Sequence, residues 1–221
     1  LDGLTQAIDS FCGQPLEAKL PLVAPPEINR GYSPPRSERI SYSLGIASPE
    51  DLFEAFNVGA GVDDHPGLDL DPVIYAANHW PDDVESFRPA VEAWFDAVRS
   101  VSETMTSVFA VALGLDEHFF DSFTDHSIDV LRINNYQIPA DIVLDDGQLG
   151  MGAHTDYGIV TVLWADPVAG LEILPVGGNW YPVKPAEGEL LINLGDLLAR
   201  WSNDRWLSTM HRVVPPRDES G

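Results

Sequence analysis

The central motif of the chain is Gly152-Ala153-His154-Thr155-Asp156-Tyr157-Gly158, and it lies within a run of short apolar segments. These segments are rich in Val, Ile, Leu and aromatic residues, and turn residues such as Asp166-Pro167 separate them. Short segments of this composition between turns are typical of β-strands. The predicted strands cover residues 130–136, 159–165, 170–175, 180–183, 190–194 and 209–214. Their close spacing favours a jelly roll or barrel over a parallel sheet.

The first half of the chain has a different pattern, in which helices and loops predominate. Apolar residues recur every three or four positions over residues 4–11 and again over residues 84–113. This spacing predicts a short amphipathic helix and a long helix with one buried stripe. Prolines scattered over residues 15–49 predict loops, residues 49–56 are expected to form a short helix, and residues 57–72 an exposed loop. The expected fold is therefore α+β with a mainly β core.

Composition narrows the classes of partner. The 221 residues include 12 basic and 35 acidic ones, for a formal net charge of −23. Such a chain repels phosphate backbones and anionic membrane surfaces, so we expect neither nucleic acid nor membrane as a partner. The single cysteine, Cys12, excludes an internal disulfide and favours a reducing, cytoplasmic location.

Three residues of the β-rich half could share a metal ion. His154 and Asp156 are two positions apart, so on an extended segment their side chains point to the same face, with Cα atoms about 6.6 Å apart. His211 lies in the last predicted strand, which an antiparallel sheet could place beside them. Two imidazoles and one carboxylate on one face of a metal leave positions open, as in non-haem Fe(II) oxygenases. Each motif taken alone also fits a structural histidine or a turn-stabilising aspartate.

The order of these motifs resembles the isopenicillin N synthase-like family of Fe(II)/2-oxoglutarate-dependent oxygenases. The resemblance extends from about Leu4 to the end of the chain. Residues 152–158 are similar to the first iron-binding segment of the family. The second iron-binding segment is matched by Asn193-Leu194-Gly195-Asp196 together with Ser208-Thr209-Met210-His211-Arg212-Val213. The strand beside the cosubstrate is matched by Leu131–Pro139, and Phe53–Gly59 is also similar to the family.

The resemblance implies a fold, a site and an activity. The fold would be a double-stranded β-helix, a distorted jelly roll buttressed by the long helix. His154, Asp156 and His211 would bind Fe(II) and form the catalytic centre, while Tyr136 and Asn134 would hydrogen-bond the cosubstrate 2-oxoglutarate. The protein would use O2 to hydroxylate, desaturate or cyclise a small molecule, with release of succinate and CO2. Residues 1–221 would form one domain, with a helical and loop part at 1–125 and an incomplete jelly-roll core at 126–221.

One departure from the family leaves alternatives open. The family anchors 2-oxoglutarate through an Arg-x-Ser pair shortly after the second histidine, and the sequence ends at Gly221, before that position. The front also lacks the family's first strands, so we expect the chain to be truncated at both ends. An Fe(II) oxidase or cyclase of the same fold that does not use 2-oxoglutarate remains an alternative, as does a non-catalytic metal-binding jelly-roll module. The sequence specifies neither the substrate nor the oligomeric state.

Residues around the motif are interpreted as structural. Asp196 is expected to be the N-cap of a brief helix. Tyr157, Trp164 and Trp201 are expected to pack in the core rather than to line a substrate pocket. Gly152 and Gly158 are expected to give the backbone conformational freedom beside the metal ligands.

Overall fold

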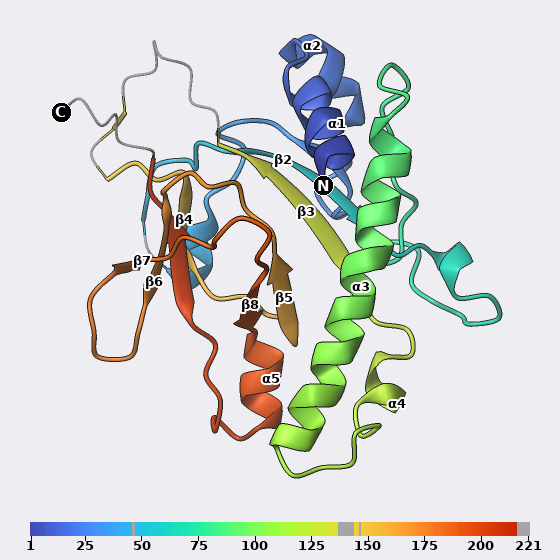
Figure 1. Ribbon diagram of the computed structural model, residues 1–221. Coiled ribbons are helices and arrows are strands. Elements are labelled where there is room, and N and C mark those ends of the chain that lie inside the picture. Colours follow the sequence, from blue (N-terminus) through green and yellow to red (C-terminus); the bar gives the residue numbers. More distant parts are fainter. Residues whose placement is uncertain (46, 137–143, 146, 216–221) are drawn as a thin grey trace. The chain divides into compact units, whose positions relative to one another are not determined.

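The strands expected in the second half of the chain are present in the computed structural model, which describes residues 1–45, 47–136, 144–145 and 147–215 (Figure 1). Each predicted strand overlaps an observed one that is shorter at one or both ends. The observed strands from residue 130 onward are β3 (Val130–Asn135), β4 (Met151–His154), β5 (Val160–Leu163), β6 (Leu171–Leu174), β7 (Tyr181–Pro182), β8 (Leu191–Leu194) and β9 (Met210–Val213). The tract Leu131–Pro139 is described only as far as Tyr136, and Gly221 lies outside the described residues.

Both predicted amphipathic helices are confirmed. The first is α1 (Asp2–Cys12), and the second is the long helix α3 (Phe87–Ala112), drawn in green in Figure 1. The other helices are α2 (Leu16–Lys19), α4 (Asp121–Thr124) and α5 (Asp196–Trp201), with 3-10 turns η1 (Leu20–Leu22), η2 (Ile40–Leu44) and η3 (Val62–Asp64). Within the described ranges, none of these helices has both the length and the apolar composition needed to cross a bilayer.

The sequence prediction is wrong for residues 49–59, whereas residues 61–72 form the expected exposed loop with one 3-10 turn. The expected helix over residues 49–56 is replaced by strand β2 (Glu54–Gly59), and the first residues of the expected exposed loop belong to that strand. Every residue of β2 is buried, because β2 is the middle strand between β1 (Gly31–Ser33) and β3. A strand covered on both faces lacks the apolar and polar alternation by which a half-buried strand is identified.

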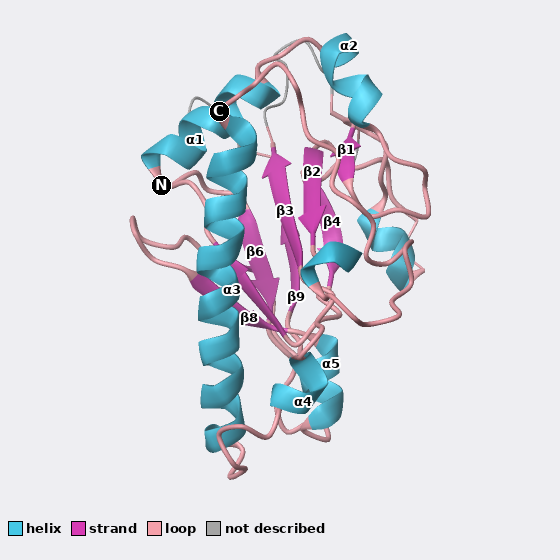
Figure 2. Ribbon diagram, turned by 90° about the vertical axis from the view of Figure 1, so that its right-hand side faces the viewer, coloured by secondary structure: helices cyan, strands magenta, loops and turns pink. Residues whose placement is uncertain are grey.

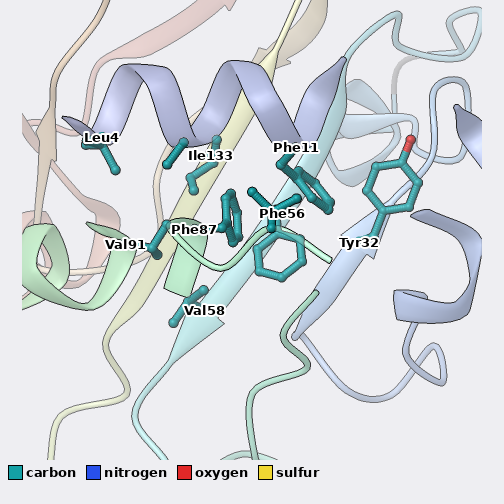
Figure 3. Close-up of a cluster of buried hydrophobic side chains, with 10 residues drawn as sticks. Leu4, Phe11, Tyr32, Phe56, Val58, Phe87, Val91 and Ile133 are labelled. Atoms are coloured by element: carbon teal, nitrogen blue, oxygen red, sulfur yellow. The ribbon is translucent and has the colours of Figure 1, made fainter. Parts of the chain in front are cut away.

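The chain divides into two compact units. The first comprises Leu1–Pro35, Glu54–Ser100 and Phe119–Asn135. Its antiparallel sheet has the order β1-β2-β3 and carries an aromatic core on one face. Phe11, Phe56 and Phe87 lie against one another with ring centroids 4.7 to 5.1 Å apart (Figure 3). Aromatic contacts of this kind add to the large apolar area that these rings bury.

The first unit also buries an ion pair. The Nζ of Lys19 donates to Glu54 Oε2 at 2.7 Å and to the carbonyl oxygen of Cys12 at 2.8 Å. Glu54 also accepts hydrogen bonds from the hydroxyl of Tyr32 and, at 2.8 Å, from the side-chain amide of Asn135. Both charges are thus paired and hydrogen-bonded, the condition under which a buried ion pair is tolerated.

The second unit comprises Arg36–Phe53, Val101–His118 and Tyr136–Gly221. It contains a four-stranded antiparallel sheet of order β4-β9-β6-β7 and a two-stranded antiparallel sheet of β5 and β8. Figure 2 shows β9 between β4 and β6. Since β4 and β9 are far apart in the sequence, their pairing brings distant side chains together, and the predicted metal ligands lie on or beside these strands.

Candidate metal centre

Strand pairing brings the two predicted histidine ligands together. His154 ends β4, His211 lies in β9, and the two residues are Cα partners across the antiparallel pair. Side chains at directly opposed positions lie on the same face of a sheet. The two imidazole rings accordingly have centroids 4.2 Å apart.

A β-bulge decides which residue of β4 faces His211. Met151 pairs with Val213, so regular pairing would place Ala153 opposite His211. The register shifts between Met151 and His154, which adds one residue to β4 and brings His154 into that position. A bulge of this kind re-aims a side chain, and bulges are common next to functional sites.

Asp156 completes a cluster with the two histidines. Its Oδ1 lies 3.8 Å from Nε2 of His154 and 3.5 Å from Nε2 of His211. The three side chains are only 15 to 21% exposed. Each offers one ligand atom, and these atoms lie within 4.8 Å of one another. The structure thus brings together all three residues that the sequence singled out.

The backbone fixes the orientation of both imidazole rings. Nδ1 of His154 lies 2.8 Å from the carbonyl oxygen of Gly152, and Nδ1 of His211 lies 3.0 Å from that of Thr209. A carbonyl oxygen only accepts hydrogen bonds, so Nδ1 must donate in both rings. In a neutral imidazole the lone pair is then on Nε2, the atom that faces Asp156. This is the tautomer that metal-binding histidines show when a backbone carbonyl orients them.

Asp156 is held at its side chain and at its backbone. Its Oδ2 accepts a hydrogen bond of 2.7 Å from the side-chain amide of Asn193 on β8. Its carbonyl oxygen accepts from the backbone N–H of Asp196 at 2.7 Å and from the hydroxyl of Ser208 at 3.5 Å. The remaining carboxylate oxygen, Oδ1, faces the two histidines.

The start of α5 packs closely on the segment after Asp156. The expectation that Asp196 is the N-cap is wrong: the N-cap is Gly195, and Asp196 is the first residue of the helix. The carboxylate of Asp196 instead accepts a hydrogen bond from the hydroxyl of Thr155 at 3.1 Å. A Cβ on Gly195 would lie only 2.1 Å from the carbonyl oxygen of Gly158. Glycine is therefore required at position 195 for close approach.

Close approach also explains one of the two glycines of the central motif. A Cβ on Gly152 would lie 2.4 Å from the hydroxyl oxygen of Ser41 in η2. Neither Gly152 nor Gly158 has a positive φ, and a Cβ on Gly158 would meet nothing within 4 Å. The expectation of special backbone freedom is therefore wrong for both residues.

The two predicted cosubstrate residues belong to different units. In the second unit, the hydroxyl of Tyr136 donates to Met151 Sδ at 3.8 Å, a contact with the strand that carries His154. In the first unit, the side-chain oxygen of Asn134 accepts from Nε of Arg132 at 3.0 Å. A role of either residue toward 2-oxoglutarate stays a prediction.

The sequence prediction is wrong for two aromatic residues near the site and assigned no role to a third residue, Asn193. Tyr157 is 85% exposed and Trp201 is 37% exposed, so the expectation that both pack in the core is wrong. Asn193 was noted only as part of a motif. The sequence signal that could have identified it is its position at the end of a predicted strand, close before the turn to Asp196.

The donor set fits a divalent first-row metal ion. Two imidazole nitrogens and one carboxylate oxygen converge without a thiolate, which disfavours a closed structural zinc site rich in cysteine. Ligand atoms about 2.1 Å from a shared ion lie roughly 3 Å apart when their bonds are at right angles. The observed 3.5 and 3.8 Å require only a small inward movement of the side chains.

Comparisons with known proteins point to one class of enzyme. A family model described as the 2OG-Fe(II) oxygenase superfamily matches residues 128–220. The chain is similar to a 2-oxoglutarate-Fe(II) type oxidoreductase, hxnY, of Emericella nidulans, with 34% identity over 215 residues that cover 94% of this chain and 60% of that protein.

Similar solved structures point to the same class of enzyme. A full-length Neurospora crassa protein in complex with alpha-KG and thymine matches with a TM-score of 0.82 and 33% identity, over 99% of this chain and 67% of that chain. A 2OG-Fe(II) oxygenase family protein from Caulobacter crescentus matches with a TM-score of 0.81 and 30% identity, over 99% of this chain and 68% of that one. These matches confirm the predicted double-stranded β-helix fold. The chain spans about 60% of the length of the curated relatives it matches.

Proposed function

Because the chain belongs to the 2OG-Fe(II) oxygenase superfamily, we propose that His154, Asp156 and His211 bind Fe(II), and that the protein uses 2-oxoglutarate and O2 to oxidise a small molecule. The observation that carries the proposal is the convergence of one ligand atom from each of the three side chains, all within 4.8 Å of one another. The superfamily match alone would not assign these roles to particular residues.

The residues of the chain supply position and orientation. The carbonyl oxygens of Gly152 and Thr209 hold the two imidazoles with Nε2 facing Asp156, where both nitrogens would bind the ion. Asp156 would contribute a carboxylate oxygen whose negative charge offsets part of the charge of the ion. When bound, Fe(II) with 2-oxoglutarate supplies the oxidising chemistry, in which one oxygen atom of O2 ends in succinate as CO2 is lost and the other oxidises the substrate. Partial burial of the three ligands limits the access of bulk water.

Tyr136 and Asn134 are proposed to hydrogen-bond 2-oxoglutarate. The contact of the Tyr136 hydroxyl with Met151 on β4 supports this role, since β4 also carries His154. Tyr136→Phe should raise the 2-oxoglutarate concentration needed for half-maximal rate more than it changes metal affinity. An unchanged cosubstrate requirement would remove Tyr136 from the proposed site.

The substrate is proposed to be a small molecule rather than a nucleic acid or a membrane. The similar Neurospora crassa protein has been solved in complex with thymine and with 5-formyluracil, which are small molecules. The net charge of −23 opposes binding of polyanions. A cytoplasmic location forms part of the proposal, and the single Cys12 supports it. We also propose that residues 1–221 form one domain, because α3 contributes residues to both compact units.

The test is a turnover assay of the Fe(II)-loaded protein that measures succinate and O2 consumption across a panel of small molecules. We expect succinate release with the wild type and none with His154→Ala or Asp156→Ala, which should also bind Fe(II) weakly. Full activity in either variant would refute the site. O2 consumption without succinate would indicate an oxidase that does not use 2-oxoglutarate.

A further inference from the structure

The two oxygens of the Asp156 carboxylate have different surroundings. Oδ1 lies 3.5 Å and 3.8 Å from the Nε2 atoms of His211 and His154. Oδ2 faces the other way and accepts a hydrogen bond of 2.7 Å from the side-chain amide of Asn193. We propose that Asn193 is a positioning residue that restricts Asp156 to binding the metal through Oδ1 alone. This inference rests on the proposed function, since it concerns the same iron site.

A carboxylate can bind a metal through one oxygen or through both. A rotation that brought Oδ2 onto the ion would break the Asn193 hydrogen bond, and hydrogen bonds to charged groups are the stronger ones. Ligation through Oδ1 alone leaves one more coordination position free. The proposed chemistry needs open positions for 2-oxoglutarate and O2, so a second bond from Asp156 would compete with them.

The backbones on both sides of this hydrogen bond are fixed. Asn193 lies in β8, where it pairs with Thr161 of β5 in a regular antiparallel ladder. Gly195, two positions after Asn193, donates its N–H to the carbonyl oxygen of Ile159 at 3.1 Å. Asp156 is held in turn through its own carbonyl oxygen by the N–H of Asp196. The amide of Asn193 therefore meets Oδ2 from a rigid support rather than from a loop.

The chemical type of residue 193 also suits this role. An amide donates a hydrogen bond but carries no charge, so it does not compete with the metal for the carboxylate of Asp156. A lysine or arginine at this position would form an ion pair that competes with the metal for the carboxylate. Another amide in this protein makes the same bond away from the site: Asn135 donates to Glu54 Oε1 at 2.8 Å in the first unit. It provides a matched control.

The experiment compares wild type, Asn193→Leu, Asn193→Asp and the control Asn135→Leu, each as the full chain with Co(II) as the probe. The leucine variant keeps nearly the same shape without a donor, and the aspartate variant keeps the same shape with acceptors only. The readouts are the Co(II) dissociation constant and the visible absorption spectrum of bound Co(II), which reports the coordination number. A melting curve of each variant verifies folding.

We expect both Asn193 variants to bind Co(II) about 10- to 100-fold more weakly, the usual effect of removing a partner that orients a metal ligand. We also expect their Co(II) spectra to differ from that of the wild type because the ligand set around Co(II) changes, an effect that general destabilisation does not produce. Asn135→Leu should melt earlier but keep the affinity and spectrum of the wild type.

Two outcomes separate failure of the inference from failure of the proposed function. Wild-type affinity and spectrum in a folded Asn193→Leu or Asn193→Asp variant would overturn the role of Asn193 while leaving the metal site intact. If Asn193→Leu does not fold, the aspartate variant decides the question alone. Absence of Co(II) binding by the wild type, or equal binding by His154→Ala, would instead overturn the proposed function.

Discussion

Gly195 offers a sharp test of how the site is supported. In Gly195→Ala the new Cβ would lie 2.1 Å from the carbonyl oxygen of Gly158 and 3.0 Å from that of Asp156, where ordinary contact begins at 3.4 Å. The backbone of Gly195 has φ −95° and ψ 173°, which alanine adopts readily, so the effect is purely steric. Both opposing atoms belong to the backbone, and relief therefore requires α5 to move away from the segment after Asp156.

That movement has a calculable cost. Overpacking of a tight contact costs about 1 to 3 kcal/mol. The displacement also weakens the 2.7 Å hydrogen bond from the N–H of Asp196 to the carbonyl oxygen of Asp156, a loss of about 0.5 to 1.5 kcal/mol. We therefore expect Gly195→Ala to lower the free energy of unfolding by about 2 to 4 kcal/mol. For a chain of this size the midpoint of thermal unfolding should fall by roughly 4 to 16 °C.

The assay is denaturant unfolding of Gly195→Ala and of Gly158→Ala, each followed by a Co(II) titration. Gly158→Ala is the matched control, because its Cβ would meet nothing within 4 Å and its φ is not positive. The free energy of unfolding of the control should lie within about 0.5 kcal/mol of the wild-type value. Equal stability of the two variants would refute the claim that the contact of α5 with this segment supports the site.

Three further predictions concern the first unit. Phe87→Ala should lower the free energy of unfolding by about 3 to 5 kcal/mol, because Phe87 is fully buried, whereas Phe123→Ala, at a side chain 59% exposed, should have little effect in the same denaturation assay. Glu54→Gln should lower the free energy of unfolding by about 3 to 5 kcal/mol, because it leaves the buried charge of Lys19 unpaired. The double variant Lys19→Met,Glu54→Gln should lose less free energy of unfolding than Glu54→Gln alone, which would verify this cause. Burial raises the pKa of Cys12 to about 12, so the unfolded chain releases its thiol proton at lower pH than the native one, and stability should fall as the pH rises from about 9 toward 12. Cys12→Ala should flatten that fall by up to about 1.4 kcal/mol per pH unit, and an unchanged pH profile of the unfolding free energy would contradict the assignment.

The sequence predicted the elements whose burial is local and regular. Every strand after residue 130 except β4 was predicted from short apolar segments between turns, and α3 was predicted from its helical spacing. Strand β2 was missed because its polar residues have partners that are distant in the sequence. Glu54 is neutralised by Lys19, 35 positions away, and bonded by Asn135, 81 positions away. No local pattern records such partners.

The candidate site shows the same division between local and distant information. The three proposed ligands could be named from the sequence, because the order of the His-x-Asp segment and the later strand histidine resembles that of a known family. Their supports were not, because Gly152 and Gly195 are required by contacts with Ser41 and Gly158, which only the folded chain brings near. From the sequence alone, a glycine required by a turn cannot be distinguished from one required by a close neighbour.

The position of His211 depends on strand register rather than on any motif. The bulge in β4 makes His154 its partner, and a slip of β9 by one residue would turn His211 to the opposite face of the sheet. The other neighbour of β9 opposes such a slip. Arg212 is the Cα partner of Glu172 on β6 and forms an ion pair with its carboxylate at an N–O distance of 2.7 Å. The guanidinium carbon of Arg212 also lies 4.1 Å from the ring centroid of Trp180. Since Arg212 and His211 are adjacent and point to opposite faces, the ion pair on one face holds the register that the proposed metal site on the other face requires.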